Sequence, residues 1–326
     1  MPHGPHQLAT HPPGRLEALR DRFVALRFGM FIHFNMATYH EVEWVDPGRD
    51  PADFNPTRLD AGRWARAARS ADMRYAVLTV KHHDGFCLWP SMHSAYGIKA
   101  SPLSGRDLVR EYVDAFRLAG IEPHLYFSVW DRTAGLHEGG PLNDRQLAFV
   151  EAQLTELLTA YGDIGSLTLD GWGNCGPAWD PDGYARIYLH VKHHQPDCLV
   201  TDHHQMQRVY RDRTLTAEAA YAINDVLHFE EPLGDWAKAP PGNLHAAHQG
   251  PTINRAWFWK QSFPDEKPLS VDAIVRERLD VLADRRCNLL LNVAPNRAGE
   301  LDANVVRRLA EVGVARAAAE SGAASA

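Results

Sequence analysis

Short apolar runs alternate with longer amphipathic stretches along most of the chain. The short runs are rich in β-branched and aromatic residues, which is typical of buried strands, whereas the longer stretches repeat their apolar residues at helical spacing. The short runs predict eight strands, at residues 29–35, 75–83, 122–129, 166–172, 198–204, 225–231, 256–260 and 288–295. The amphipathic stretches predict helices at residues 60–71, 106–119, 144–161, 181–194, 271–283 and 302 to about 317.

This alternation indicates an α/β fold of the (β/α)8 TIM-like barrel type. Continuous apolar strands need helices over their outer face, and eight of them close a barrel. We assign residues 15–318 to one barrel, in which residues 208–222 and 240–251 show no clear helical pattern. The proline-rich start, residues 1–14, and the Ala/Ser/Gly-rich end, residues 319–326, have few large apolar side chains, and we expect both tails to be disordered.

Several predicted strands begin with apolar residues and end with polar ones. In a barrel of parallel strands, the carboxyl ends of all strands meet at one rim, where active sites are built. The endings are IHFN, TVKHHD, LYFS, TLDG, VTDHH and HFEE, in chain order. We therefore expect histidine, aspartate, glutamate and tyrosine side chains to converge on one site at this rim.

The charge balance excludes some classes of partner. The chain has 34 Lys and Arg against 41 Asp and Glu, a formal net charge of −7, whereas nucleic-acid binding needs an excess of clustered cations. No stretch approaches the roughly 20 apolar residues of a membrane span, and the first residues lack the apolar core of a signal peptide. We expect a cytoplasmic, soluble protein with no nucleic-acid and no membrane partner, and leave a homo-oligomer open. The four cysteines have no Cys-x-x-Cys spacing, so we expect reduced, mostly buried thiols.

The chain contains 18 histidines, which raises the question of a metal site. Hydrolytic zinc sites usually use His-x-His on a strand or His-Glu-x-x-His on a helix, and the sequence contains neither pattern. A Gly-x-Ser-x-Gly nucleophile elbow and a phosphate-binding Gly-x-x-x-x-Gly-Lys loop are also absent from it. We therefore predict no metal and no cofactor.

Carboxylates at strand ends are the remaining candidates for catalysis. Asp170 closes the fourth predicted strand, and Glu230 and Glu231 close the sixth. Two carboxyl groups facing each other across a sugar are the minimum apparatus of a glycosidase. Tryptophans at or after strand ends can pack on the apolar face of a pyranose. They include Trp44, Trp172, Trp257 and Trp259.

Motifs over residues 20–316 resemble those of the α-L-fucosidases of glycoside hydrolase family 29. The most specific is KHHDGF at residues 81–86, in the second predicted strand. Others follow in the same order as in the family: RFGMFIHF at 27–34, EW at 43–44, FNP at 54–56, RDLV at 106–109, LYFS at 125–128, LDG at 169–171 and NLLLNV at 288–293.

The resemblance implies retaining exo-hydrolysis of terminal α-L-fucosides, on fucosylated oligosaccharides or glycoconjugates, through a covalent glycosyl-enzyme. Asp170 matches the nucleophile, and Glu230 or Glu231 would be the acid/base, with Glu230 preferred for its position at the strand end. The stretch 257–259 matches an aromatic wall near the 5-methyl group of fucose. Neutral imidazoles can exchange hydrogen bonds with sugar hydroxyls without a metal. The predicted substrate-binding residues are His33, Glu43, Trp44, His82, His83, Tyr126, Trp172, His203, Trp257 and Trp259.

Three departures from the family pattern leave alternatives open. Thr168 stands two residues before Asp170, where the family usually has an aromatic residue. The first strand ends His33-Phe34-Asn35 instead of His-Trp-Gly. The chain stops after its eighth βα unit, so we expect no C-terminal β-sandwich of the kind common in the family. The alternatives are a related barrel glycosidase for another sugar and a fucose-binding protein without turnover.

Overall fold

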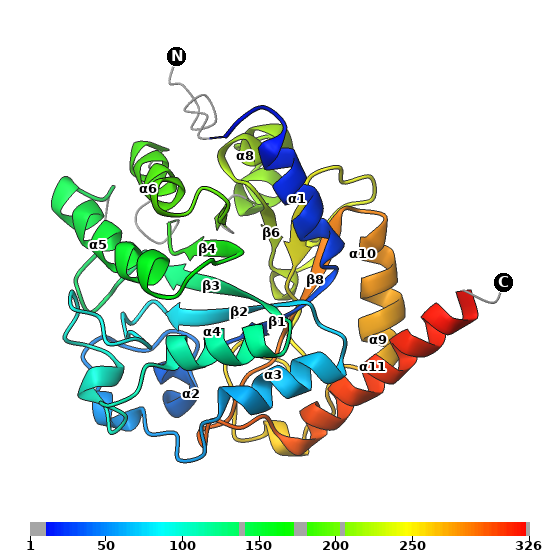
Figure 1. Ribbon diagram of the computed structural model, residues 1–326, viewed down its shortest axis with the longest axis horizontal. Coiled ribbons are helices and arrows are strands. Elements are labelled where there is room, and N and C mark those ends of the chain that lie inside the picture. The colour runs from blue at the N-terminus through cyan, green and yellow to red at the C-terminus, as the bar shows by residue number, and fades with distance from the viewer. Residues whose placement is uncertain (1–10, 137–140, 173–180, 203–205, 324–326) are drawn as a thin grey trace.

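The computed structural model describes residues 11–136, 141–172, 181–202 and 206–323. Within these residues, eight parallel strands form one sheet with helices around its outside (Figure 1). The strands are β1 (Phe28–Ile32), β2 (Tyr75–Lys81), β3 (Glu122–Ser128), β4 (Ser166–Asp170), β5 (Leu199–Asp202), β6 (Leu227–Phe229), β7 (Ala247–Gln249) and β8 (Cys287–Asn292).

The strand order is β5-β4-β3-β2-β1-β8-β7-β6, so the two ends of the sheet are β5 and β6. These ends meet through Asp225, whose backbone N–H donates to the Val200 carbonyl at 2.9 Å and whose carboxylate accepts from the Val200 N–H at 2.8 Å. The carboxylate also lies 2.6 Å from Lys192 Nζ, and both side chains are fully buried. Although burial opposes ionisation, Lys192 holds the pKa of Asp225 below its usual value. The result is a nearly closed (β/α)8 barrel, which confirms the predicted fold class.

Helices alternate with the strands and mostly begin at side chains that cap their first turn. Asp60 accepts from the Gly62 N–H, and Asp107 accepts from the Arg110 N–H. Asn143 and Gln146 form a reciprocal capping box. The helices are α1 (Arg15–Ala25), α2 (Met36–His40), α3 (Ala61–Ser70), α4 (Leu108–Leu118), α5 (Asp144–Ala160), α6 (Pro181–His194), α8 (Ala217–Ile223), α9 (Val271–Ile274), α10 (Val281–Ala283) and α11 (Ala303–Ala323). None of these helices is long and apolar enough to cross a membrane.

The seventh predicted strand was wrong. The strand is Ala247–Gln249, a three-residue segment with two polar side chains, whereas residues 256–260 form bends after it. Trp257 and Phe258 are buried there without strand pairing, because their apolar surface packs over the mouth of the barrel beside His33. Residues 208–222 gave no clear helical pattern. They contain most of the π-helical turn η4 (Gln207–Arg211) and most of α8.

The predicted tails fall partly outside the described residues, which exclude 1–10 and 324–326. At the described end of the chain, α11 continues to Ala323, so residues 319–323 are helical and not disordered. The reason is local: this end is rich in alanine, which has the highest helix propensity. Of the four cysteines, Cys87, Cys198 and Cys287 are buried free thiols, and Cys175 lies outside the described residues.

The barrel interior contains several histidines that the sequence left without a role. His124 is fully buried, with Nδ1 2.6 Å from Ser166 Oγ and Nε2 3.2 Å from Glu122 Oε1. His228 and His248 lie on neighbouring strands with ring centroids 4.6 Å apart. His124 and His248 pack with the aromatic rings of Phe23 and Tyr75 inside the barrel, so part of the histidine excess is structural.

Candidate active site

A cavity of about 390 Å³ opens at the carboxyl ends of the strands. Most of its polar side chains come from several separate strands or from the residues directly after them, as expected for a barrel active site. It is lined by Phe31, His33, Glu43, Trp44, His82, His83, Tyr126, Thr168, Asp170, Met206, Gln207, His228, Glu230, Leu233, Trp236, Ala237 and Trp257.

Asp170, the last residue of β4, is held by two donors in this cavity. Tyr126 OH donates to its Oδ2 and the Gly171 N–H donates to its Oδ1. Burial, together with the Asp170 carboxylate, raises the pKa of Tyr126 well above its ordinary value, so the phenol stays protonated and remains a donor. The Asp170 side chain is thereby fixed in one orientation while the residue keeps 7% of its surface exposed.

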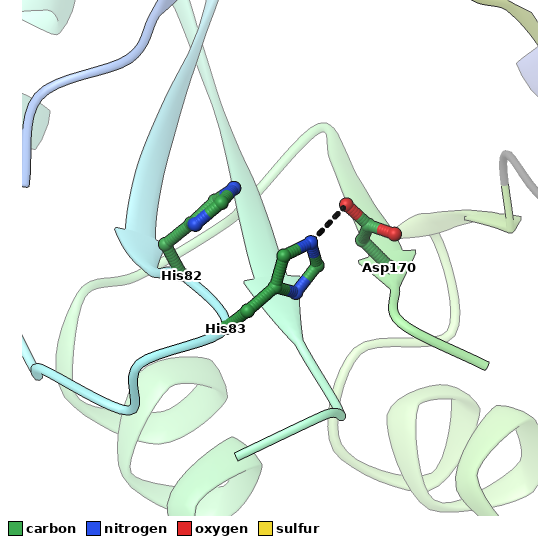
Figure 2. A group of neighbouring side chains, drawn as sticks. All are labelled: His82, His83 and Asp170. Carbon is green, nitrogen blue, oxygen red and sulfur yellow. Dashed lines mark ion pairs between the residues drawn. The ribbon is translucent and has the colours of Figure 1, made fainter. Parts of the chain in front are cut away.

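His82 and His83 both reach the cavity, although adjacent residues in a strand point to opposite faces. They can do so because β2 ends at Lys81, one residue earlier. Figure 2 shows the two rings beside Asp170, with His83 Nε2 3.5 Å from Asp170 Oδ2. The turn that follows requires Gly85, which has φ +90°; a Cβ there would lie 2.2 Å from Asp131 Oδ1.

Hydrogen bonds set the ring orientations of His83 and His33. The Ser128 hydroxyl donates to the Trp130 carbonyl at 2.9 Å, so its oxygen accepts from Nδ1 of His83, 2.7 Å away. Asn292 acts similarly at the end of β8. Its amide nitrogen donates to the Trp257 carbonyl at 2.8 Å, which leaves its oxygen to accept from His33 Nδ1 at 2.7 Å. Each ring is therefore held in a defined orientation in the cavity, with His83 Nε2 turned toward Asp170.

A buried ion pair lies behind the two histidines. Lys81 Nζ is 3.1 Å from Asp131 Oδ2 and 2.7 Å from Gln153 Oε1, and all three side chains are buried. The Arg132 N–H donates to the His83 carbonyl at 2.9 Å. These contacts join the loops after β2 and β3 and help to hold His82 and His83 in place.

Asp84, next to this pair, gives a stability prediction. Burial raises its pKa to about 7, and the neighbouring Asp131 carboxylate adds to the effect. The folded state then keeps a proton that the unfolded chain loses near pH 4, so this residue lowers the free energy of unfolding as the pH rises from about 4 to about 7. We expect Asp84→Asn to be more stable than the parent protein, by roughly 2 kcal/mol at pH 5 and about 4 kcal/mol at pH 8. Denaturant unfolding at both pH values measures the difference; a stability gap that does not change with pH would contradict it.

Two glutamates share the cavity with Asp170. Glu230 directly follows β6, and Glu43 lies in the loop after α2. Both carboxylates are close enough to raise the pKa of Tyr126 through their charges. Partial desolvation and the Asp170 charge raise the pKa of Glu43, while Lys260 opposes this shift. The cavity therefore holds one fixed carboxylate and two candidates for proton transfer.

Three predicted site residues do not line the cavity. Glu231 faces the other way, where Arg278 Nε lies 3.1 Å from both its carboxylate oxygens and Gln249 donates to it at 2.6 Å. Trp259 donates its indole N–H to Asp302 at 2.8 Å, and the ring of buried Trp172 packs edge-on against Tyr184. Glu230 lines the cavity and Glu231 does not. The structure thus distinguishes two acids that the sequence left as alternatives. A fourth prediction, His203, lies outside the described residues.

The cavity also contains residues that the sequence analysis missed. Met206, Gln207, Leu233 and Trp236 line it, in segments without a regular hydrophobic pattern. Asn292 orients His33 from the end of β8, and the only signal for it was the polar ending of the NLLLN run.

Among the described residues, one group of side chains could hold a metal ion. His82, His83 and Asp170 each offer a ligand atom, and these atoms lie within 4.8 Å of one another (Figure 2). Two imidazoles and a carboxylate suit zinc. The same Asp170 oxygen already accepts a hydrogen bond from Tyr126, and His83 is oriented by Ser128. The absence of a catalytic metal stays a prediction.

Comparison with known proteins agrees with this geometry. Residues 38–315 match the family model of alpha-L-fucosidase. The chain is 31% identical over 298 residues to alpha-L-fucosidase 1 of Arabidopsis thaliana, covering 87% of this chain and 57% of the plant protein. It is 25% identical over 276 residues to the plasma alpha-L-fucosidase of Rattus norvegicus, covering 80% of this chain and 55% of the rat protein. The chain thus spans little more than half the length of these relatives.

A solved structure of an alpha-L-fucosidase is also similar to this chain. The fold superimposes on alpha-L-fucosidase isoenzyme 1 from Paenibacillus thiaminolyticus with a TM-score of 0.74 and 28% sequence identity, over 91% of this chain and 75% of the bacterial one. The family model covers most of the barrel and the residues that form its cavity, apart from those contributed by β1. The chain belongs to the alpha-L-fucosidase family, glycoside hydrolase family 29.

Proposed function

We propose that this protein is a retaining exo-α-L-fucosidase that acts by double displacement. The observation that carries the proposal is the Asp170 carboxylate, oriented by Tyr126 and Gly171 in a cavity that it shares with Glu230. A carboxylate fixed in this way can attack a sugar carbon without first reorganising. A solved structure with a TM-score of 0.75 is titled as a trapped covalent intermediate of a family 29 α-L-fucosidase; at 21% identity it supports the shared fold alone.

The first step forms a glycosyl-enzyme. An Asp170 oxygen attacks C1 of the fucoside, the bond from C1 to the glycosidic oxygen breaks, and protonated Glu230 gives its proton to the departing oxygen. In the second step, Glu230 takes a proton from water, the water oxygen bonds to C1, and the bond from C1 to Asp170 breaks. Two inversions at C1 release α-L-fucose, so the configuration is retained.

Histidine rings account for recognition of the sugar hydroxyls in this proposal. His33 and His83 line the cavity, and a hydrogen bond at Nδ1 holds each ring in its orientation. The ring of Trp257 lies 4.9 Å from that of His33, beside Phe31, and gives the cavity an apolar side. We assign this side to the 5-methyl group of fucose, because a methyl group gains free energy where water is excluded.

Thr168 favours a second candidate, a barrel glycosidase for a related sugar. It lines the cavity, and among the described residues its buried hydroxyl has no hydrogen-bond partner. A hydroxyl left without a partner is costly unless a ligand supplies one. The second candidate places C6 of the sugar at Thr168 instead of beside Trp257. There the hydroxyl group of an L-galactoside would supply a partner, whereas the methyl group of a fucoside would not.

A panel of aryl glycosides separates the candidates. We expect hydrolysis of p-nitrophenyl α-L-fucoside well above that of the α-L-galactoside and of other aryl glycosides, and proton NMR should show the α-anomer as the first product. A preference for the L-galactoside would favour the second candidate. Binding of fucose without turnover of any substrate would contradict both and leave a fucose-binding protein.

Chelation tests the expectation that catalysis needs no metal. We expect dialysis against EDTA to leave kcat/KM for the aryl fucoside unchanged, since the proposed steps use only carboxylates. Added Zn²⁺ should inhibit competitively, because it would occupy His82, His83 and Asp170, which the sugar needs. Loss of activity on chelation, restored by one metal, would show that the site is a metal centre.

A further inference from the structure

The cavity that holds Asp170 and Glu230 is also lined by large apolar side chains that are partly or largely exposed. They are Trp44, Leu233 and Trp236. Trp44 is 50% exposed and Leu233 is 47% exposed. Large apolar side chains grouped at a cavity mouth mark a surface that a ligand covers.

The loop after β6 carries both the proposed acid and this apolar surface. Glu230 is followed by the 3-10 turns η5 (Glu231–Leu233) and η6 (Asp235–Ala237), with Gly234 between them at φ +117°. Ala237 is buried and fixes the end of the second turn. The Arg211 guanidinium lies 5.8 Å from the centroid of the Trp236 ring and supports it from η4. The loop that carries Leu233 and Trp236 is therefore held in place by contacts with other parts of the protein.

The chemistry sets the direction in which a substrate extends. A general acid must lie on the side of the oxygen that it protonates, and the leaving group is attached to that oxygen. If Glu230 is the acid, the leaving group extends away from Asp170 past Glu230. The side chains next reached along the same loop are Leu233 and Trp236.

We propose that Leu233 and Trp236 form a leaving-group subsite that takes a ring with an apolar face, either an aryl group or the pyranose ring of a second sugar. The subsite rests on the proposed function, because it binds the group that hydrolysis releases. Indole rings pack well on such faces, and Leu233 adds contact area without competing for hydrogen bonds. Trp44, which packs edge-on against Trp130, adds a further exposed apolar ring to the lining of the same cavity.

Substrates with and without a leaving-group ring test the proposal. We expect Trp236→Ala to lower kcat/KM roughly 5- to 30-fold for p-nitrophenyl α-L-fucoside or for a fucosyl disaccharide, and less than about twofold for α-L-fucosyl fluoride, whose leaving group is one atom. Leu233→Ala should show the same selectivity with a smaller loss. Trp236→Phe keeps an aromatic face and should recover most of the activity. Leu244→Ala removes the same groups from another exposed leucine and is the matched control.

The outcomes separate this proposal from the proposed function. A loss on the aryl substrate alone assigns the subsite to aryl groups, and a loss on the disaccharide alone assigns it to a sugar. Equal losses on all three substrates, or no loss on either ring-bearing substrate, would overturn the subsite. Failure of the parent protein to hydrolyse fucosyl fluoride would instead overturn the proposed function, before any variant is compared.

Discussion

Asp170→Asn is expected to lower kcat/KM for p-nitrophenyl α-L-fucoside by at least about 1,000-fold, because an amide cannot form the covalent glycosyl-enzyme. The substitution preserves the shape of the side chain and an acceptor for Tyr126 or the Gly171 N–H, so the fold should persist. Thermal unfolding and circular dichroism check that the variant is folded, and steady-state kinetics measure the loss.

Azide distinguishes a missing nucleophile from general damage. In Asp170→Gly the space of the carboxylate is vacant, and azide can attack C1 in its place. A single inversion would give β-L-fucosyl azide and restore part of the activity. Activity of either Asp170 variant within tenfold of the parent protein would remove Asp170 from the nucleophile role.

Glu230→Ala is expected to lower kcat/KM about 100- to 10,000-fold for an alkyl α-L-fucoside, whose leaving oxygen must be protonated. The loss should be much smaller for an aryl fucoside with an acidic leaving group, since that oxygen departs without a proton. Azide should accelerate turnover of the aryl substrate by replacing water in the second step, and the product should be the α-azide. This is opposite to the product expected from Asp170→Gly.

Glu231→Gln and Glu43→Gln are the matched comparisons for Glu230. Glu231 is paired with Arg278 outside the cavity, so its variant should keep activity within a few-fold. Glu43 lines the cavity and should weaken substrate binding without changing the dependence on the leaving group. If azide rescue and the dependence on leaving-group acidity appear in a Glu43→Ala variant instead, Glu43 is the acid/base.

The barrel was predictable from the sequence because most of its strands carry their own signal. Runs such as YAVLTVK in β2 and NLLLN in β8 are mainly apolar, and every residue in them is buried. β7 lacked that signal, since Ala247–Gln249 is short and polar and is held by pairing with its neighbours. The stretch around Trp257 has an apolar pattern typical of a strand, but its residues are buried beside the cavity and do not form one.

The site was predictable where one strand end carries several polar residues together, as with His82 and His83. The orientation of a site residue was not predictable where it depends on side chains that are distant in the sequence. Arg278 is 47 residues from Glu231 in sequence, and its ion pair is what turns that glutamate away from the cavity. Asn292 and Ser128 orient histidines through single hydrogen bonds, which leave no pattern in the sequence.

Trapping of the glycosyl-enzyme tests the central claim most directly. The protein is incubated with 2-deoxy-2-fluoro-α-L-fucosyl fluoride. Its fluorine at C2 slows both steps, whereas its activated leaving group speeds only the first, so the glycosyl-enzyme accumulates. The intact mass should rise by one 2-fluorofucosyl group, and peptide mapping should place that group on Asp170 in the β4 peptide. An unmodified protein that still hydrolyses fucosides, or a label on any other residue, would contradict the account.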